Sequence, residues 1–420
     1  MLLIKNGRVC GVPEGVSDVL IEDGKITAIS GNIQEIGGMT VLDASGLVVA
    51  PGLVDMHVHF REPGFEHKED ILTGASAASA GGVTTCCCMP NTSPAADCAE
   101  VIKRIADKAE AAPIIVLPIG AVTMGQDGRE LTDFGALKAA GAVALSDDGN
   151  SIQNAKLMYI AMQLAWEQDL LIISHCEDAD MAQNYAVNEG RVSWDLMLPG
   201  RPAIAEEIMV ARDAMLAAKT GAKLHIAHVS TARSVDIIRK AKEAGVKITA
   251  ETCPQYFTLT EDEILKQWAL ARVNPPLRTK DDVEAIIAGL VDGTIDAIAT
   301  DHAPHSEDEK ALPFISAPSG MIGLETSLAL ALTRLYHTNR LSVDEIIALM
   351  SRKPAQILGI NAGQLAESST ADIVIFDPDE EWTVKPEKFK SKARNTPFGG
   401  MKLKGKVKYT ISRGNIVYRN

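Results

Sequence analysis

The chain has 420 residues, enough to bury a large core, and its length fits two or three domains or one large domain with a smaller one beside it. Hydrophobic residues make up 46% of the chain, as in ordinary folded proteins, and the formal net charge of −14 argues against a nucleic-acid-binding surface. The seven cysteines follow no disulfide spacing, which indicates free thiols in a reducing compartment. The first residues lack a signal-peptide pattern, and no apolar run reaches the ~18 residues that span a bilayer. We therefore expect a cytoplasmic protein.

Both ends of the chain carry short β-type runs separated by turns rich in Gly and Asp. The runs near the start are residues 2–4, 19–21, 26–29 and 41–42, and those near the end are residues 372–377, 406–411 and 414–418. Neither group is long enough to bury a sheet alone. We therefore predict that residues 1–50 and 363–420 pair into one small β-sandwich.

Between the two ends, apolar β-type runs alternate with helical stretches. The apolar runs are residues 53–59, 83–89, 114–119, 142–148, 170–175, 223–229, 247–253 and 296–301. The helical stretches are residues 69–80, 95–111, 153–168, 203–220, 231–244 and 280–290. Eight such strands with crossovers of helix length predict a TIM-type (β/α)8 barrel over residues 51–362. An open doubly wound sheet is the alternative, but no Gly-x-Gly-x-x-Gly turn follows the first strand.

The chemistry of such a barrel lies at the carboxyl ends of its strands. The first strand ends in His57 and His59, whose side chains point the same way because strand residues alternate between faces. Two neighbouring imidazoles are half of a zinc site, although two solvated histidines on a surface strand would give the same pattern. Four later strands also end in residues that can bind a metal. These are Asp148, His175, His228 and Asp301.

Two of these assignments rest on the direction of side chains along a strand. Asp147 and Asp148 point apart, and we choose Asp148 because it stands beside a glycine where the strand turns outward. His225 lies three positions before His228, so alternation puts the two on opposite faces. The strand-terminal His228 is the better candidate for the barrel mouth.

Four histidines and two carboxylates exceed the needs of one tetrahedral zinc, whereas two ions about 3.5–4 Å apart would use the whole set. Two cations lower the pKa of a shared water and so supply a nucleophile near neutral pH. Asp301 can take the proton and pass it to a leaving nitrogen. The predicted chemistry is hydrolysis of an amide-like bond.

Two motifs give the chain a resemblance to a known family. Residues 55–64 read Asp-Met-His-Val-His-Phe-Arg-Glu-Pro-Gly, and residues 299–305 read Ala-Thr-Asp-His-Ala-Pro-His, followed by Lys310. They resemble signatures of the amidohydrolase superfamily, and within it of the zinc-dependent class I type of dihydroorotase, and the resemblance covers nearly the whole chain. It implies that Asp148 bridges the metals, where many relatives use a carbamylated lysine. It implies that the other ligands are His57, His59, His175, His228 and Asp301.

The same resemblance implies a set of substrate contacts. Arg61 can hold a substrate carboxylate with a bidentate fork, and Asn274 contacts the ring amide. The alternative for Arg61 is a surface salt bridge with Glu62 or Glu66, and Asn91 could instead form an Asx turn. The complete set of expected contacts is Arg61, Asn91, Asn274, His305, Ser319 and Gly320.

The resemblance implies reversible, zinc-dependent cyclisation of N-carbamoyl-L-aspartate to L-dihydroorotate in pyrimidine biosynthesis. Another cyclic amidase, such as an allantoinase or dihydropyrimidinase, is the first alternative. A non-catalytic scaffold subunit is the second. A homodimer and an association with aspartate carbamoyltransferase are both open, and residues 305–320 could form a mobile cover or a static loop.

Overall fold

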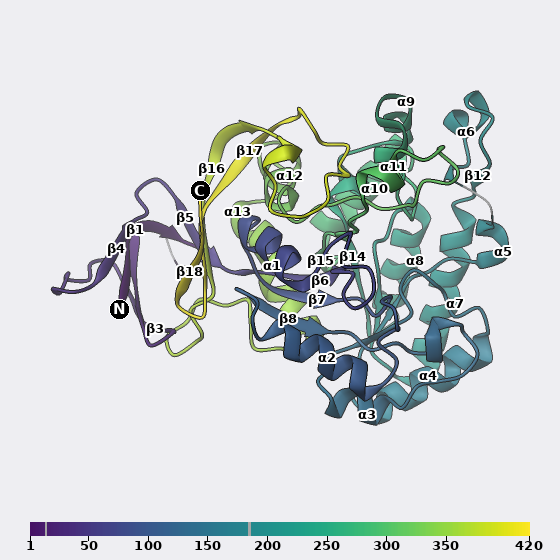
Figure 1. Ribbon diagram of the computed structural model, residues 1–420, viewed down its shortest axis with the longest axis horizontal. Helices are drawn as coiled ribbons and strands as arrows, with labels where there is room; N and C mark the ends of the chain where they lie inside the picture. The colour runs from purple at the N-terminus through teal and green to yellow at the C-terminus, as the bar shows by residue number, and fades with distance from the viewer. Residues whose placement is uncertain (13–14, 184–185) are drawn as a thin grey trace.

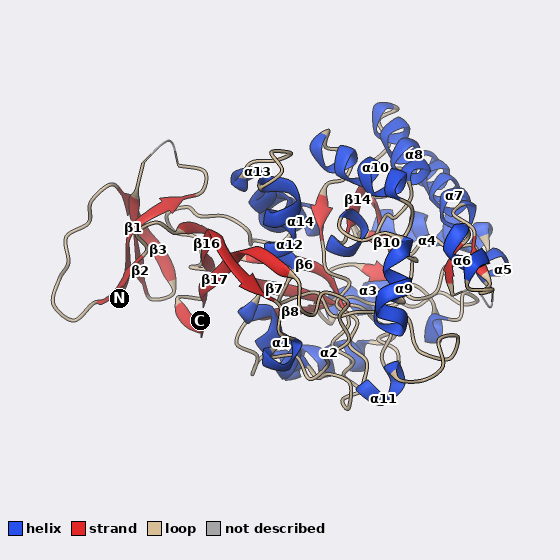
Figure 2. Ribbon diagram, turned by 90° about the horizontal axis from the view of Figure 1, so that it is seen from above, coloured by secondary structure: helices blue, strands red, loops and turns tan. Residues whose placement is uncertain are grey.

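The computed structural model describes residues 1–12, 15–183 and 186–420, which form a β-sandwich and a barrel (Figure 1). Both ends of the chain lie in the sandwich, beside the barrel and its surrounding helices (Figures 1 and 2). Within the described residues, no helix is long and apolar enough to cross a membrane.

The β-sandwich is built from strands at both ends of the chain, as predicted. The strands are β1 (Leu2–Val9), β2 (Ser17–Glu22), β3 (Lys25–Ser30), β4 (Thr40–Asp43), β5 (Val48–Pro51), β16 (Ile373–Thr383), β17 (Lys402–Ser412) and β18 (Asn415–Arg419). β5 pairs antiparallel with β16 and so joins the two ends. β1 pairs with β4 in its first half and with β5 at its end, so it passes from one layer to the other. Ile4, Val49 and Ile373 meet in the buried core between the layers.

Eight parallel strands form the barrel. They are β6 (Leu53–Val58), β7 (Val83–Cys88), β8 (Ile115–Pro118), β9 (Leu145–Ser146), β10 (Ile172–Ser174), β13 (Leu224–Ile226), β14 (Ile248–Thr252) and β15 (Ala297–Ile298). β6, β7 and β8 form one sheet, and β9, β10, β13, β14 and β15 form another. Bridges from Gly120 to Leu145 and from Val58 to His302 close the ring. The predicted barrel is confirmed, and the open sheet is excluded.

Helices cover the outside of the barrel (Figure 2). The α-helices of the described residues, including short ones at the barrel mouth, are α1 (Ile71–Ala80), α2 (Ala99–Ala109), α3 (Phe134–Ala139), α4 (Ala155–Glu167), α5 (Ala179–Ala182), α6 (Arg191–Asp195), α7 (Ile204–Thr220), α8 (Ala232–Glu243), α9 (Ile264–Gln267), α10 (Lys280–Val291), α11 (Glu307–Lys310), α12 (Ser327–Ala331), α13 (Val343–Ile347) and α14 (Lys353–Leu358). Several begin at side chains that accept the first free N–H groups, such as Asp70 before α1 and Thr279 before α10.

Two apolar cores hold the barrel. Val54, Met56 and Ile173 lie in the core inside the ring. Leu53, Leu224 and other strand residues of the opposite face pack against the helices. Because both faces of most of these strands are buried, the strands appear in the sequence as continuous apolar runs.

The structure differs from the prediction in the lengths of strands and in inserted elements. β9 and β15 have only two residues each, shorter than the predicted runs of residues 142–148 and 296–301. The short helix α3 was not predicted. Between β10 and α7 the chain inserts α5, α6 and the two-stranded pair β11 (Val187–Asn188) and β12 (Gly200–Arg201), which delivers Arg201 to the edge of the mouth.

Candidate active site

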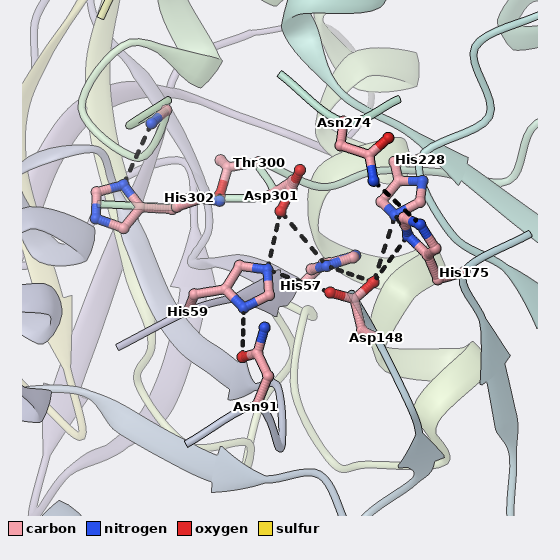
Figure 3. A network of polar contacts seen from close by, with 12 residues as sticks. His57, His59, Asn91, Asp148, His175, His228, Asn274, Thr300, Asp301 and His302 are labelled. Carbon is pink, nitrogen blue, oxygen red and sulfur yellow. Dashed lines mark hydrogen bonds and ion pairs between the residues drawn. The ribbon is translucent and has the colours of Figure 1, made fainter. Parts of the chain in front are cut away.

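Five barrel strands bring four histidines and two aspartates to one point at their carboxyl ends (Figure 3). β6 supplies His57 and, just past its end, His59. Residues within three positions of the ends of β9, β10, β13 and β15 supply Asp148, His175, His228 and Asp301. All six side chains are buried, and none is more than 6% exposed. The predicted ligands therefore lie together.

The first group of candidate ligand atoms comes from β6 and β15. Nε2 of His59 lies 3.0 Å from Oδ1 of Asp301, and Nε2 of His57 lies 3.6 Å from the same oxygen. The ligand atoms of these three residues all lie within 4.8 Å of one another. Two imidazole nitrogens and a carboxylate are a set that zinc accepts.

The second group surrounds Asp148. Its Oδ1 lies 3.4 Å from Nε2 of His57, 3.4 Å from Nε2 of His228 and 3.6 Å from Nδ1 of His175. Its Oδ2 lies 3.4 Å from Nε2 of His59, in the first group. The two oxygens of one carboxylate thus face both groups, which is the arrangement a bridging ligand needs.

Two buried polar atoms at this point lack hydrogen-bond partners among the described residues, and they indicate whether a cation would fit here. These atoms are Nε2 of His57 and Oδ1 of Asp148. A buried polar atom without a partner costs free energy, and a shared cation would satisfy both atoms. The residues present therefore fit a metal centre.

The electric field at this point also favours positive charge. Burial opposes a charge on His57, but the carboxylate of Asp148 outweighs burial and raises the pKa of the imidazole well above its usual value. Burial likewise opposes a charge on Asp148, yet the imidazoles of His57, His175 and His228 hold the pKa of its carboxyl well below the usual range.

Two further side chains orient the histidines of β6. Glu251 on β14 places Oε1 2.7 Å from Nδ1 of His57, and Asn91 places Oδ1 2.8 Å from Nδ1 of His59. Because both oxygens accept, each Nδ1 carries the proton and each Nε2 is free to bind a metal. Sequence reasoning missed Glu251, although a charged residue inside an apolar run was a usable signal.

Replacing Glu251 with glutamine tests this orienting role. The amide keeps an oxygen near Nδ1 of His57 but loses the negative charge, so zinc affinity should fall about 10–100-fold. Competition with a chromophoric chelator measures that affinity directly. The matched control is Glu243→Gln on the exposed end of α8, which should bind zinc as the parent does. Equal affinity in both variants would remove Glu251 from the site.

A cavity of about 190 Å³ opens above the candidate metal ligands. Of the predicted site residues, only His57 is missing from its wall, because that side chain is fully buried. The predicted substrate contacts in the wall are Arg61, Asn91, Asn274, His305, Ser319 and Gly320. The structure therefore brings the predicted contacts together around one cavity.

The positively charged guanidinium of Arg61 lines this cavity. Its Nε donates to the carbonyl of Pro304 at 3.2 Å, and no carboxylate among the described residues lies within 4.0 Å of its guanidinium. Glu62 instead lies 3.3 Å from Lys108. Burial lowers the pKa of Arg61 to about 10, so the guanidinium stays charged at neutral pH. The alternative of a surface salt bridge is absent from the described structure.

His305 and the loop that ends in Gly320 form the wall beside Arg61. Nε2 of His305 lies 2.9 Å from the carbonyl of Ser319, which can only accept, so this nitrogen carries a proton. Burial, followed by the nearby charge of Arg61, lowers the pKa of His305 to about 2, and the ring is neutral. Gly320 has φ +135°, and a Cβ there would lie 2.8 Å from Cβ of Ala303. The wall therefore requires a glycine.

Asn274 closes the opposite side of the cavity. Its Nδ2 lies 3.4 Å from Nε2 of His175 and 3.5 Å from Glu177, and its Oδ1 accepts a hydrogen bond from Arg201. Glu177 also accepts from Arg201 at 2.7 Å. Sequence reasoning did not find Glu177 or Arg201, since neither stands at the end of a predicted strand.

The structure tests the choices of Asp148 over Asp147 and of His228 over His225. Asp147 accepts from the backbone of Val122 and Thr123, so Asp148 alone reaches the histidines. The choice of His228 as the candidate ligand stands, but the prediction that His225 and His228 face opposite ways was wrong, since both side chains lie inside the barrel. Nε2 of His225 lies 3.3 Å from Glu251 inside the barrel, because the strand ends at Ile226 and a left-handed backbone at His228 (φ 34°) resets the alternation.

Left-handed backbone recurs at the site. Arg61, His228 and Asp301 have φ values of 65°, 34° and 48°. This region is uncommon for residues other than glycine and is found where the surrounding structure holds a functional side chain in place.

Comparisons with known sequences identify the family of this chain. The Dihydro-orotase-like family model matches residues 46–234, and the Amidohydrolase family model matches residues 186–418. A dihydroorotase of Acetivibrio thermocellus is 50% identical over 422 residues, which cover 100% of this chain and 99% of the relative. A dihydroorotase of Clostridioides difficile is also 50% identical, with 100% of both chains covered.

Solved structures agree on the fold. An L-hydantoinase (dihydropyrimidinase) from Arthrobacter aurescens has a TM-score of 0.87 and 25% identity, covering 100% of this chain and 96% of that one. A dihydropyrimidinase from Brevibacillus agri has a TM-score of 0.86 and 26% identity, covering 100% and 95%. The identity to these two proteins is about half of that to the two dihydroorotases. The chain belongs to the dihydroorotase family of the amidohydrolases.

Proposed function

We propose that this site interconverts N-carbamoyl-L-aspartate and L-dihydroorotate and that it does so with zinc. The observation that carries the proposal is a pair of candidate ligand groups that share His57 and lie beside a cavity lined by Arg61. Among the described residues the Arg61 guanidinium has no carboxylate partner. The cyclic substrate has one free carboxylate, which would complete that pairing. Allantoin and dihydrouracil have none.

The ligand set supports two zinc ions. His57, His59 and Asp301 would hold one, and His175 and His228 the other, with Asp148 between them. When bound, the ions lower the pKa of water and polarise the ring carbonyl.

The protein's own residues divide the remaining work. The carboxylate of Asp301 takes a proton from the attacking water and delivers it to the departing ring nitrogen, and the reverse transfer closes the ring. The guanidinium of Arg61 binds the substrate carboxylate with the help of Asn91 and His305. Asn274 and the backbone of Ser319 and Gly320 hold the ring amide.

A substrate comparison tests the proposed function. The purified zinc-loaded protein is assayed with dihydroorotate, allantoin and dihydrouracil under one set of conditions. Turnover of dihydroorotate alone is expected. Comparable turnover of either other compound would instead indicate a less selective cyclic amidase.

Metal analysis separates the enzyme from a scaffold subunit. About two zinc ions per chain are expected, since all six ligands lie together. A chain that purifies without metal, binds none when zinc is added and has no activity would favour the scaffold.

Lys310 gives a prediction on the wall of the cavity. This buried side chain donates from Nζ to the carbonyls of Pro318 and Gly320 at 2.9 and 3.0 Å, and Nδ2 of Asn395 donates to the same Gly320 carbonyl at 3.1 Å. Lys310→Met keeps the apolar stem but leaves the Pro318 carbonyl without its donor, at about 1–3 kcal/mol, while the Gly320 carbonyl keeps only the donor from Asn395. We expect KM to rise about tenfold. Lys280→Met, at the exposed start of α10, is the control.

The measurement is the split between KM and kcat. Because Lys310 contacts none of the six metal ligands, kcat and zinc content should stay near the parent values. A fall in kcat with KM unchanged would show that the wall does not position substrate.

Location and assembly are part of the proposal. All seven cysteines are free thiols, which supports a reducing, cytoplasmic location. A homodimer and association with aspartate carbamoyltransferase are arrangements that size measurement of the purified protein would test. The pairing of β5 with β16 supports a division into a sandwich of residues 1–50 and 363–420 and a barrel of residues 51–362.

A further inference from the structure

A second cavity lies where the last strands of the sandwich meet the barrel helices. Its volume is about 560 Å³, within the range of small-molecule sites. β16, β17 and β18 contribute Trp382, Lys406 and Tyr418, and the chain that leads into α12 contributes Glu325. It shares no lining residue with the cavity above the metal ligands.

The charges around this cavity are mostly positive, in a chain whose net charge is −14. No carboxylate among the described residues lies within 4.0 Å of any of the five cations, whereas Lys402 on the same strand β17 pairs with Glu381 at 3.0 Å. The five cations are Lys385, Lys388, Lys390, Lys406 and Arg419. Unpaired cations around one cavity are a concentrated binding site for a polyanion.

Glu325 is the one acidic side chain in the lining. Its negative charge is largely compensated by hydrogen bonds and by partial protonation. Its Oε1 accepts from the backbone N–H groups of Lys390 at 2.7 Å and Ser391 at 3.1 Å. Burial raises its pKa to about 7, so near neutral pH the carboxyl is partly protonated. It therefore subtracts little from the positive charge of the cavity.

Aromatic rings give the cavity flat apolar surfaces and hold one of the cations in place. Nζ of Lys406 lies 3.9 Å from the centre of the Trp382 ring, and the indole donates to the carbonyl of Gly405 at 2.8 Å. The half-buried rings of Phe389 and Tyr418 lie in the same wall. Flat rings next to cations, one of them held over Trp382, suit a ligand that has both an aromatic ring and phosphate groups.

We propose that this cavity binds a phosphorylated small molecule with an aromatic ring, of the class of nucleoside di- and triphosphates. The phosphates contact Lys388 and Lys406, and the ring packs against the aromatic wall. The site is separate from the metal centre, so binding does not require the catalytic residues.

Titration calorimetry of the zinc-loaded enzyme tests this proposal, with ATP, inorganic phosphate and adenosine as separate probes and magnesium present. ATP should bind at one site per chain, at least about tenfold more tightly than inorganic phosphate, and more weakly as salt is raised. Adenosine alone should bind weakly, since it lacks the charges.

Variants locate the binding. Lys388→Ala and Lys406→Ala should each weaken ATP binding at least about tenfold, whereas Lys402→Ala, which removes a paired lysine of the same strand, should leave it unchanged. All three should turn over dihydroorotate normally, which also shows that they fold. No saturable binding of ATP, equal binding of inorganic phosphate, or binding that survives both substitutions would overturn the proposal.

Discussion

Replacing Asp301 with asparagine is expected to lower kcat by about 10²–10⁴-fold, the range for loss of a general acid–base group. The amide keeps an oxygen in the position that lies 3.0 Å from Nε2 of His59, so a neutral ligand for the metal remains. It cannot accept a proton from the attacking water or return one to the leaving nitrogen. Because substrate binding does not need that proton, KM should change much less than kcat.

Zinc content decides how that result is interpreted. Metal analysis of Asp301→Asn should give the parent stoichiometry, and a variant that had lost zinc would say nothing about proton transfer until zinc was restored. Asp308→Asn, at an exposed position of α11 a few residues along the same chain, is the matched control and should keep the parent kcat. More than a tenth of the parent kcat in a fully loaded Asp301→Asn would exclude the carboxylate as the proton carrier.

The residues that sequence reasoning found share one property, which is that their signal is local. His57 and His59 end an apolar run, and alternation along that run gives their common direction without knowledge of any other segment. The ends of four other strands repeat the pattern. Since parallel strands in a barrel present their carboxyl ends at one rim, local signals were sufficient to predict that the ligands meet.

The residues that it missed depend on register between distant segments. Glu251 reaches His57 across 194 positions of sequence, and Asn395 reaches the carbonyl of Ala303 across 92. Nothing near either residue in the sequence indicates its partner. The misjudged direction of His225 has a related cause, because periodicity holds only inside a strand and β13 ends at Ile226, before His228.

The fold, like the candidate site, was predictable where the sequence carries a local pattern. Buried parallel strands and amphipathic crossovers leave strong periodic patterns, and all eight strands were found. The short elements α3, β11 and β12 leave weaker periodic patterns. A strand of two residues has no period of its own, and a helix of six residues spans fewer than two turns.

Replacing Arg61 with alanine is expected to raise KM for dihydroorotate and leave the chemistry intact. The guanidinium has no carboxylate partner within 4.0 Å among the described residues, so its charge is available to the substrate. Truncating one member of a partly buried charge pair costs about 2–3 kcal/mol, which corresponds to a rise in KM of about 30- to 150-fold. Zinc content and kcat should stay near the parent values.

Arg61→Lys distinguishes charge from geometry. A lysine restores the positive charge but cannot form the two parallel hydrogen bonds of a guanidinium, so its KM should lie between those of the parent and Arg61→Ala. Arg129→Ala, in an exposed loop, is the control for loss of a surface arginine. Any slow turnover of dihydrouracil, which has no carboxylate, should be the same in parent and Arg61→Ala. If KM for dihydroorotate were unchanged in Arg61→Ala, the selectivity for the carboxylate would have to come from His305 and Asn91 alone, and neither carries a positive charge at neutral pH.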